Sequence, residues 1–340
     1  MISFYPLVFE PIYKSKIWGG RRLATLFDRN LPSGEDIGES WEICDYKNEV
    51  SVVKDGDFEG MTLAELREKY PEELFGEQAE EFKDRFPLLL KFINAEEPLS
   101  LQVHPDNRYA AKHENDSGKC EAWYIVDAMP GAKITRAFKA GTTKTKVVKA
   151  IKQNKVEPLV NTFEVNTDDA IYIPPGTLHG IGSGLVIAEI QQSSDITYRV
   201  YDYNRTDKDG NQRELHIDKA IDVMSFRDPG SDTLRPINLD PLHQKLCVCD
   251  FFSLYVYKFR EPIHEYSINR FRMLVNLEGY GTILSPEGLF EDVEFSPGTS
   301  ILIPAAVKDF SLVPATYCKM LDIIPGKMNL RKQKHVPQDV

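Results

Sequence analysis

The stretch Ser100–Trp123 decides the fold; it reads Ser-Leu-Gln-Val-His-Pro-Asp from residue 100 and Gly-Lys-Cys-Glu-Ala-Trp from residue 118. Around its start, apolar side chains alternate with Ser100, Gln102 and His104, a period of two that predicts a strand with two unlike faces. Gln102 and His104 are two residues apart, so we expect them on the same face. A polar loop follows, and the apolar run after it predicts a strand that Glu121 opens after a short hairpin connection.

A second histidine ends a turn motif farther along, Ile-Pro-Pro-Gly-Thr-Leu-His at 173–179. Two imidazoles, a carboxylate and an amide oxygen are donors that suit Zn²⁺. Each residue alone has a structural interpretation, as a core histidine or a solvated glutamate. The spacing Pro-x-Gly-x-x-His is similar to the second motif of the cupins, jelly-roll barrels that close around a metal. Together the residues predict a metal site formed by Gln102, His104, Glu121 and His179.

Composition favours a mainly β protein. The chain has 340 residues, with 21 Gly, 21 Pro, 15 Tyr and 18 Phe, which is typical of many short strands and turns. This length exceeds the usual size of one domain. We therefore predict two jelly-roll (cupin) β-barrels with a few inserted α-helices. A polar segment rich in proline, 229–241, suggests a boundary.

The predicted boundary gives two domains. Residues 1–235 form a metal-binding catalytic cupin domain with helical insertions, and residues 236–340 form a second cupin-like barrel. The second half repeats the strand and turn pattern of the first. Where the first half has the histidine motif, the second has Pro304-Ala305-Ala306, so we expect it to lack metal ligands.

The net charge of the chain limits the kinds of molecule that it can bind. The chain has 41 Lys and Arg against 52 Asp and Glu, a net charge of −11, and no basic patch with interleaved aromatics. This argues against a nucleic-acid partner. A small phosphorylated substrate needs only a local cluster of Lys or Arg.

The sequence has neither an apolar stretch of membrane-spanning length nor a signal-peptide pattern at its start. We therefore expect a cytoplasmic protein without membrane contact, as a monomer or small homo-oligomer.

The five cysteines are scattered and odd in number, which argues against a disulfide scaffold and predicts reduced thiols. Cys247 and Cys249 form a C-x-C pair on a predicted strand, so their thiols are expected on one face. We interpret them as small buried apolar residues; the alternative is a metal site.

Two cations interrupt apolar strands. Lys91 lies within the run 86–93, where an unpaired ammonium is costly to bury. Either it reaches the strand edge or it lines a pocket. Arg199 lies among β-branched and aromatic residues, and either pairs with a carboxylate such as Asp195 or Asp202 or points into a cavity.

The sequence also resembles a known family, the type I phosphomannose isomerases, in its compact bacterial form. The matching segments are Leu-Ser-Leu-Gln-Val-His-Pro-Asp-Asn (99–107), Gly-Lys-Cys-Glu-Ala-Trp-Tyr (118–124), Ile-Pro-Pro-Gly-Thr-Leu-His (173–179) and Glu-Ile-Gln-Gln-Ser-Ser-Asp-Ile-Thr-Tyr-Arg (189–199), with Trp-Gly-Gly (18–20) and Gly-Glu-Ser-Trp-Glu (38–42) upstream. The resemblance covers most of the chain. It implies a metal-dependent aldose–ketose isomerase that interconverts mannose 6-phosphate and fructose 6-phosphate through an enediol.

By position, the resemblance implies one Zn²⁺ per chain and a role for each matching residue. The zinc ligands are Gln102, His104, Glu121 and His179. The catalytic residues are Lys119, Glu189 and Arg199, and the substrate-binding residues are Lys91, Ser100, Lys119 and Arg199.

Two other functions remain open at this stage. A cupin-class non-haem iron oxygenase would use two histidines and one carboxylate as an iron triad. A non-catalytic sugar-binding cupin would keep the pocket without turnover. Three cations, Lys91, Lys119 and Arg199, converging on one cavity would favour the isomerase.

Overall fold

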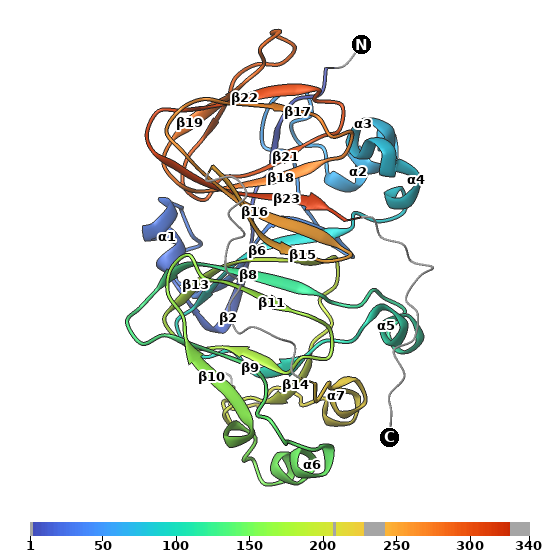
Figure 1. Ribbon diagram of the computed structural model, residues 1–340, viewed down its shortest axis with the longest axis vertical. Coiled ribbons are helices and arrows are strands. Elements are labelled where there is room, and N and C mark those ends of the chain that lie inside the picture. The colour runs from blue at the N-terminus through green and yellow to red at the C-terminus, as the bar shows by residue number, and fades with distance from the viewer. Residues whose placement is uncertain (1–2, 207–208, 228–241, 327–340) are drawn as a thin grey trace.

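The computed structural model describes residues 3–206, 209–227 and 242–326. It is mainly β, with four large antiparallel sheets arranged as two barrels (Figure 1), which confirms the predicted fold class. The predicted division at 235/236 falls outside the described residues and stays a prediction. Within the described ranges, no helix is long and apolar enough to cross a membrane.

The first barrel consists of a six-stranded and a five-stranded sheet. In spatial order the six-stranded sheet has β11 (Ala170–Ile173), β8 (Glu121–Ala128), β13 (Leu185–Gln192), β6 (Leu88–Ala95), β3 (Ile37–Ile43) and β2 (Ile12–Gly20). The five-stranded sheet has β10 (Val160–Glu164), β9 (Lys133–Phe138), β12 (His179–Ile181), β7 (Leu101–Val103) and β14 (Tyr198–Tyr201).

The second barrel consists of a six-stranded and a four-stranded sheet. The former has β1 (Leu7–Val8), β21 (Ser300–Ile303), β18 (Arg272–Glu278), β23 (Cys318–Pro325), β16 (Phe252–Phe259) and β15 (His243–Val248). The latter has β17 (Ile263–Tyr266), β22 (Asp309–Pro314), β19 (Gly281–Leu284) and β20 (Val293–Phe295). A small hairpin pairs β4 (Asp45–Tyr46) with β5 (Glu49–Val50).

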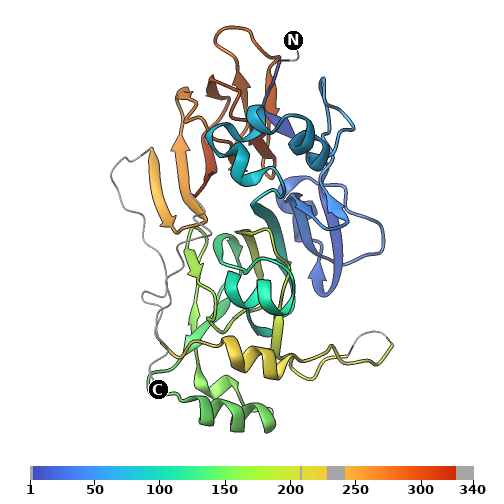
Figure 2. The ribbon, with the colours of Figure 1, turned by 90° about the vertical axis from the view of Figure 1, so that its right-hand side faces the viewer.

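Short helices connect or cover the sheets. They are α1 (Arg22–Phe27), α2 (Leu63–Lys69), α3 (Pro71–Phe75), α4 (Ala79–Phe82), α5 (Asn107–His113), α6 (Lys144–Lys152) and α7 (Ile217–Val223), with 3₁₀ turns η1 (Gly76–Gln78) and η2 (Glu157–Leu159). Figure 2 shows α6 and α7 together at the end of the first barrel. Their apolar side chains cover the outer face of the five-stranded sheet.

The expected hairpin before Glu121 is wrong. Residues 107–113 form α5, because the Asp106 carboxylate accepts a hydrogen bond from the backbone N–H of Tyr109 and caps the helix. The helix carries the chain from β7 in one sheet to β8 in the opposite sheet of the barrel. The residues at the two ends of this stretch therefore face each other across the barrel.

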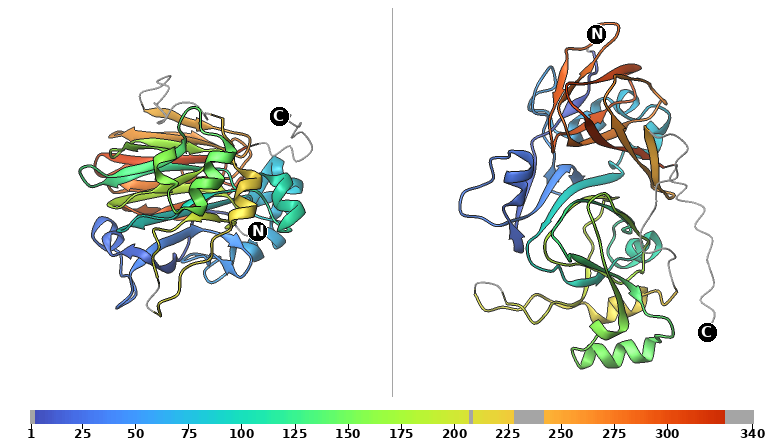
Figure 3. Two further views of the ribbon diagram at one scale, coloured as in Figure 1. Left: turned by 90° about the horizontal axis from the view of Figure 1, so that it is seen from below. Right: turned by 60° about the vertical axis from the view of Figure 1, so that its left-hand side comes forward.

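The central strands β8, β13 and β6 are covered on both faces. Alternate side chains such as Leu90, Phe92 and Tyr124 point outward and share one large core with the six-stranded sheet of the second barrel. The sheets consequently lie in layers, as Figure 3 shows from below, and the first barrel closes around its own interior, seen at the right.

The opposite faces of these strands form the barrel interior. Trp123, Glu189, Lys91 and Trp41 lie in register on neighbouring strands of the six-stranded sheet. Cross-strand neighbours share a face, so the four side chains form a row. A second row of cross-strand neighbours lies on the five-stranded sheet and consists of Arg136, His179, Gln102 and Arg199.

Candidate active site

Two histidines and a glutamate meet between the two sheets. His179 Nε2 lies 3.2 Å from Glu121 Oε1, and His104 Nε2 lies 3.5 Å from Glu121 Oε2. The three side chains are buried, and their ligand atoms lie within 4.8 Å of one another. This is the expected geometry for three ligands of one divalent metal ion.

The hydrogen bonds of the two imidazoles leave Nε2 free to bind a metal. His104 Nδ1 lies 2.7 Å from the carbonyl oxygen of Ile196, and His179 Nδ1 lies 2.8 Å from that of Thr177. A carbonyl only accepts, so each Nδ1 carries the proton and each Nε2 carries a lone pair. Among the described residues, His104 Nε2 and Glu121 Oε1 are buried without a hydrogen-bond partner. Orphaned acceptors of this kind fit a bound cation.

Burial also keeps both imidazoles neutral. It lowers the pKa of His179 to about 4, and it lowers the pKa of His104 well below its usual value, with Lys119 contributing. Neutral imidazole is the form that ligates a metal.

Gln102 lies beside this group. Its Nε2 is 3.4 Å from His179 Nε2, while its Oε1 accepts a hydrogen bond from Ser100 Oγ at 3.3 Å. A half-turn of the amide exchanges these two atoms and turns the oxygen toward the histidines. Gln102 as a fourth ligand therefore stays a prediction, with its position favourable.

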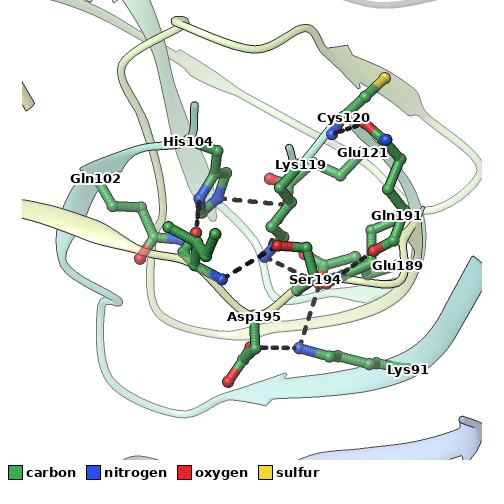
Figure 4. Close-up of polar contacts among 12 residues, drawn as sticks. Lys91, Gln102, His104, Lys119, Cys120, Glu121, Glu189, Gln191, Ser194 and Asp195 are labelled. Atoms are coloured by element: carbon green, nitrogen blue, oxygen red, sulfur yellow. Dashed lines mark hydrogen bonds and ion pairs between the residues drawn. The ribbon is translucent and has the colours of Figure 1, made fainter. Parts of the chain in front are cut away.

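Ammonium and carboxylate groups alternate next to the histidines (Figure 4). Lys119 Nζ lies 3.1 Å from Glu121 Oε2 and 3.9 Å from Glu189 Oε1. Lys91 Nζ lies 4.0 Å from Glu189 Oε1 and 3.1 Å from Asp195 Oδ1. Lys91 therefore points into the barrel rather than reaching the strand edge.

These contacts set the protonation states. Burial opposes the charge on Lys91 and Lys119, but the neighbouring carboxylates outweigh it and raise the pKa of both. Burial raises the pKa of Glu189, and repulsion from Glu121 raises it further, against the attraction of the two lysines. Glu189 is thus a carboxyl group that is easier to protonate than an ordinary glutamate, which is typical of acid/base residues.

Two tryptophans hold the carboxylates in place. Trp123 Nε1 donates to Glu189 Oε2 at 2.9 Å, and Trp41 Nε1 donates to Glu39 Oε2 at 2.7 Å. The Lys91 ammonium lies 4.5 Å from the centre of the Trp41 ring, a cation–π contact. Trp123 and Trp41 thus position charged side chains by direct contact.

Arg199 belongs to a cluster of guanidinium groups at the other end of the site. Arg205 and Arg213 both pair with Asp202, which lies near Arg199 as well. Burial and repulsion from Arg213 lower the pKa of Arg199, whose Nε is buried without a hydrogen-bond partner among the described residues. Arg199 donates to the carbonyl oxygen of Glu214 at 2.7 Å. Among the described residues, these three cations surround one buried carboxylate, which leaves an excess of positive charge.

A cavity of about 250 Å³ extends from Gln102 and Lys119, beside the His-Glu-His group, to Arg199 and Arg213. The residues that line it include Lys91, Ser100, Gln102, Lys119, Glu189 and Arg199. All four residues predicted to bind substrate are in this set, as are the three predicted catalytic residues. The His-Glu-His group lies deeper, and Lys119 and Gln102 connect it to the cavity.

Sequence reasoning missed several lining residues, including Lys16, Glu39, Thr197 and Arg213. Glu39 lies in the segment 38–42 that resembles the family, but no spacing rule links it to Lys91. The sequence suggests Asp195 as a partner of Arg199; in the structure Asp195 pairs with Lys91.

Comparison with known proteins adds independent information. Residues 7–127 match the family model described as phosphomannose isomerase type I, catalytic domain. The chain is 37% identical over 316 residues to mannose-6-phosphate isomerase ManA of Bacillus subtilis, an alignment covering 92% of this chain and 97% of that protein. It is 37% identical over 306 residues to the mannose-6-phosphate isomerase of Streptococcus mutans, covering 90% and 94%.

Structural comparison agrees. The crystal structure of mannose 6-phosphate isomerase from Bacillus subtilis superposes with a TM-score of 0.84 at 32% identity. The alignment covers 94% of this chain and 99% of that chain. The similarity therefore includes both barrels as well as the segment matched by the family model.

Proposed function

Because the chain belongs to the type I phosphomannose isomerase family, we propose that it interconverts mannose 6-phosphate and fructose 6-phosphate through an enediol. The observation that carries this proposal is the position of the buried His-Glu-His group beside a cavity lined by Lys91, Lys119 and Arg199. An oxygenase would account for the metal ligands alone. The cations of the cavity favour an anionic sugar.

We assign the cation to His104, Glu121 and His179, with Gln102 as the fourth ligand and Zn²⁺ as the ion. When bound, the cation supplies a Lewis acid for the substrate oxygens at C1 and C2. The chain provides one carboxylate and two neutral imidazoles, and hydrogen bonds to backbone carbonyls fix the two imidazoles before the ion arrives.

Glu189 is our candidate for moving the proton between C1 and C2. Trp123 fixes one of its carboxylate oxygens and leaves the other facing the lysines. Its raised pKa brings it closer to the operating pH, where general acid/base transfer is efficient. Lys119, between Glu121 and Glu189, places a fixed positive charge where the enediolate oxygens become negative.

The guanidinium cluster is our candidate for the phosphate subsite. Arg199 and Arg213 line the cavity, and among the described residues one buried carboxylate, Asp202, pairs with the arginines around it. A phosphate dianion would compensate the excess charge with bidentate hydrogen bonds. The Ser100 hydroxyl lies on the same cavity and adds a neutral donor. The substrate would then extend from the arginines toward Glu189.

A coupled assay of the purified, metal-analysed protein tests the function. It follows fructose 6-phosphate formed from mannose 6-phosphate before chelation, after chelation and after Zn²⁺ is restored. We expect activity to disappear and return with the metal. A protein with full metal content and no turnover would contradict the proposed reaction, and oxygen consumption with bound iron would replace it by the oxygenase.

We further propose that the enzyme works in the cytoplasm as a monomer or small homo-oligomer. All five cysteines are free thiols, as expected in a reducing compartment. Cell fractionation and light scattering test these two statements separately.

A further inference from the structure

Two cysteines from different barrels meet behind the active site. Cys120 Sγ lies 3.9 Å from Cys249 Sγ, although the residues are 129 positions apart. Cys120 immediately precedes β8 of the first barrel, and Cys249 immediately follows β15 of the second. Cys120 is buried, whereas Cys249 is partly exposed. A small oxidant therefore has access to one thiol of the pair.

We propose that Cys120 and Cys249 are a thiol modification site, which hydrogen peroxide converts reversibly into a disulfide that lowers the activity of the enzyme. The Cys249 thiolate attacks the O–O bond and becomes a sulfenic acid, and the released hydroxide takes up a proton to form water. The Cys120 sulfur then displaces the sulfenic hydroxyl, which leaves as a second water with the Cys120 proton. Two thiols are oxidised and one peroxide is reduced to two waters.

The surroundings favour Cys249 as the attacking thiol. Its pKa is lowered, first because the Cys120 thiol donates a hydrogen bond to its sulfur, and further by the backbone at Phe251 and Phe252. Cys247, the other member of the C-x-C pair, is buried, and burial raises its pKa to about 12. The two neighbouring cysteines thus differ sharply in thiolate character, which sets reactivity.

A disulfide here would act on the active site. The sulfurs must approach from 3.9 Å to about 2.05 Å, so at least one of the two cysteines has to change its position or side-chain conformation. Cys120 lies between Lys119 and Glu121, and its own sulfur points away from the charged cluster (Figure 4). Pulling Cys120 toward the second barrel shifts both flanking side chains. The loss of turnover rests on the proposed function, whereas the cross-link does not.

Peptide mapping of the intact protein, under non-reducing conditions after titration with hydrogen peroxide, provides the first test. We expect a peptide that joins Cys120 to Cys249, has lost two hydrogens and separates on reduction with dithiothreitol. A cross-link through Cys247, or none at all while the thiols become sulfinic acids, would overturn the proposal. This measurement needs no activity, so its outcome is independent of the substrate assignment.

Matched variants provide the second test. Turnover and metal content are followed in wild type, Cys249→Ser and Cys247→Ser before peroxide, after peroxide and after dithiothreitol. We expect wild type and Cys247→Ser to lose most of their turnover reversibly, with metal content unchanged, and Cys249→Ser to keep it. Equal inactivation of Cys249→Ser would refute the switch.

Discussion

At the scale of single residues, the candidate metal site depends on hydrogen bonds that the two histidines make away from Glu121. The carbonyls of Ile196 and Thr177 fix the tautomers of His104 and His179, so both Nε2 atoms face Glu121. The site is thereby formed in advance, and removing one imidazole should cost metal affinity as well as geometry.

We predict that His179→Ala loses the bound metal and lowers turnover by about 10²-fold or more, because the remaining ligands lack one of two imidazole donors. Metal content by elemental analysis and the coupled assay check both effects. His264→Ala is the control, since His264 is exposed on the second barrel and should retain metal and activity. Full metal stoichiometry in His179→Ala would remove His179 from the ligand set.

Substitutions of the two arginines that line the cavity should change different kinetic parameters. We predict that Arg199→Ala keeps metal and fold but lowers turnover by about 10²-fold, the scale for losing a charge that stabilises the transition state. Arg213→Ala should mainly raise KM for the phosphorylated substrate, because it contacts only the phosphate end in our proposal. Steady-state kinetics at saturating substrate distinguish the two; unchanged turnover in Arg199→Ala would leave that residue a structural role.

The sequence indicated the positions of the candidate ligands better than it indicated their surroundings. Gln102, His104 and His179 follow from a period of two and a turn motif, which are local signals. Glu39 and Asp195 reach Lys91 only because β3, β6 and the segment after β13 come together in three dimensions. Such contacts depend on strand order and register, which are not encoded in any short stretch.

At the scale of elements, β6 shows why the orientation of the strands could not be predicted from the sequence. All eight of its residues are buried, because one face lines the active site and the other packs against the second barrel. A strand covered on both faces has no alternation of polar and apolar residues. Only the lysine at 91 marks which face is the interior.

A buried ion pair between strands β18 and β23 leads to a prediction about the stability of the fold. Buried Arg272 on β18 donates to both carboxylate oxygens of Asp322 on β23, at 3.0 and 2.9 Å. We predict that Asp322→Asn lowers the free energy of unfolding by about 1 to 3 kcal/mol, because the buried guanidinium loses a doubly hydrogen-bonded carboxylate and keeps only Glu265, at 2.8 Å, as a counter-charge among the described residues. Urea unfolding measures this loss, and exposed Asp292→Asn should change little.

The contribution of the Arg272–Asp322 pair to stability should depend on pH. Burial alone would raise the pKa of Asp322, but Arg272 and His243 outweigh it, so the pKa lies below the ordinary 3.8. The ionised carboxylate therefore stabilises the fold above about pH 4, and the stabilisation disappears as pH falls through the lowered pKa. The difference between wild type and Asp322→Asn should shrink in that acidic range; a constant difference would contradict the charge-based explanation.

At the scale of the whole molecule, the two barrels share one core. Leu321 on β23 and Val256 on β16 lie on the face that carries Lys258 and Lys319, and both lysines pair with Asp168 of the first barrel. The outer face of the catalytic sheet packs into the same apolar cluster. The second barrel thus supports the sheet from which Glu121, Glu189 and Lys91 project, and we expect the barrels to unfold together.

Leu321→Ala tests this coupling, since it removes a fully buried side chain from the second barrel at the layer between the sheets. We predict a loss of about 2 to 5 kcal/mol in unfolding free energy. The chain's three tryptophans, at 18, 41 and 123, all lie in the first barrel, so their fluorescence reports on that barrel alone. If the core is shared, the fluorescence transition shifts as far as the transition followed by circular dichroism, while Leu289→Ala, 55% exposed, moves neither. A fluorescence transition that stays in place while circular dichroism shows a separate early step would mean that the barrels are independent units.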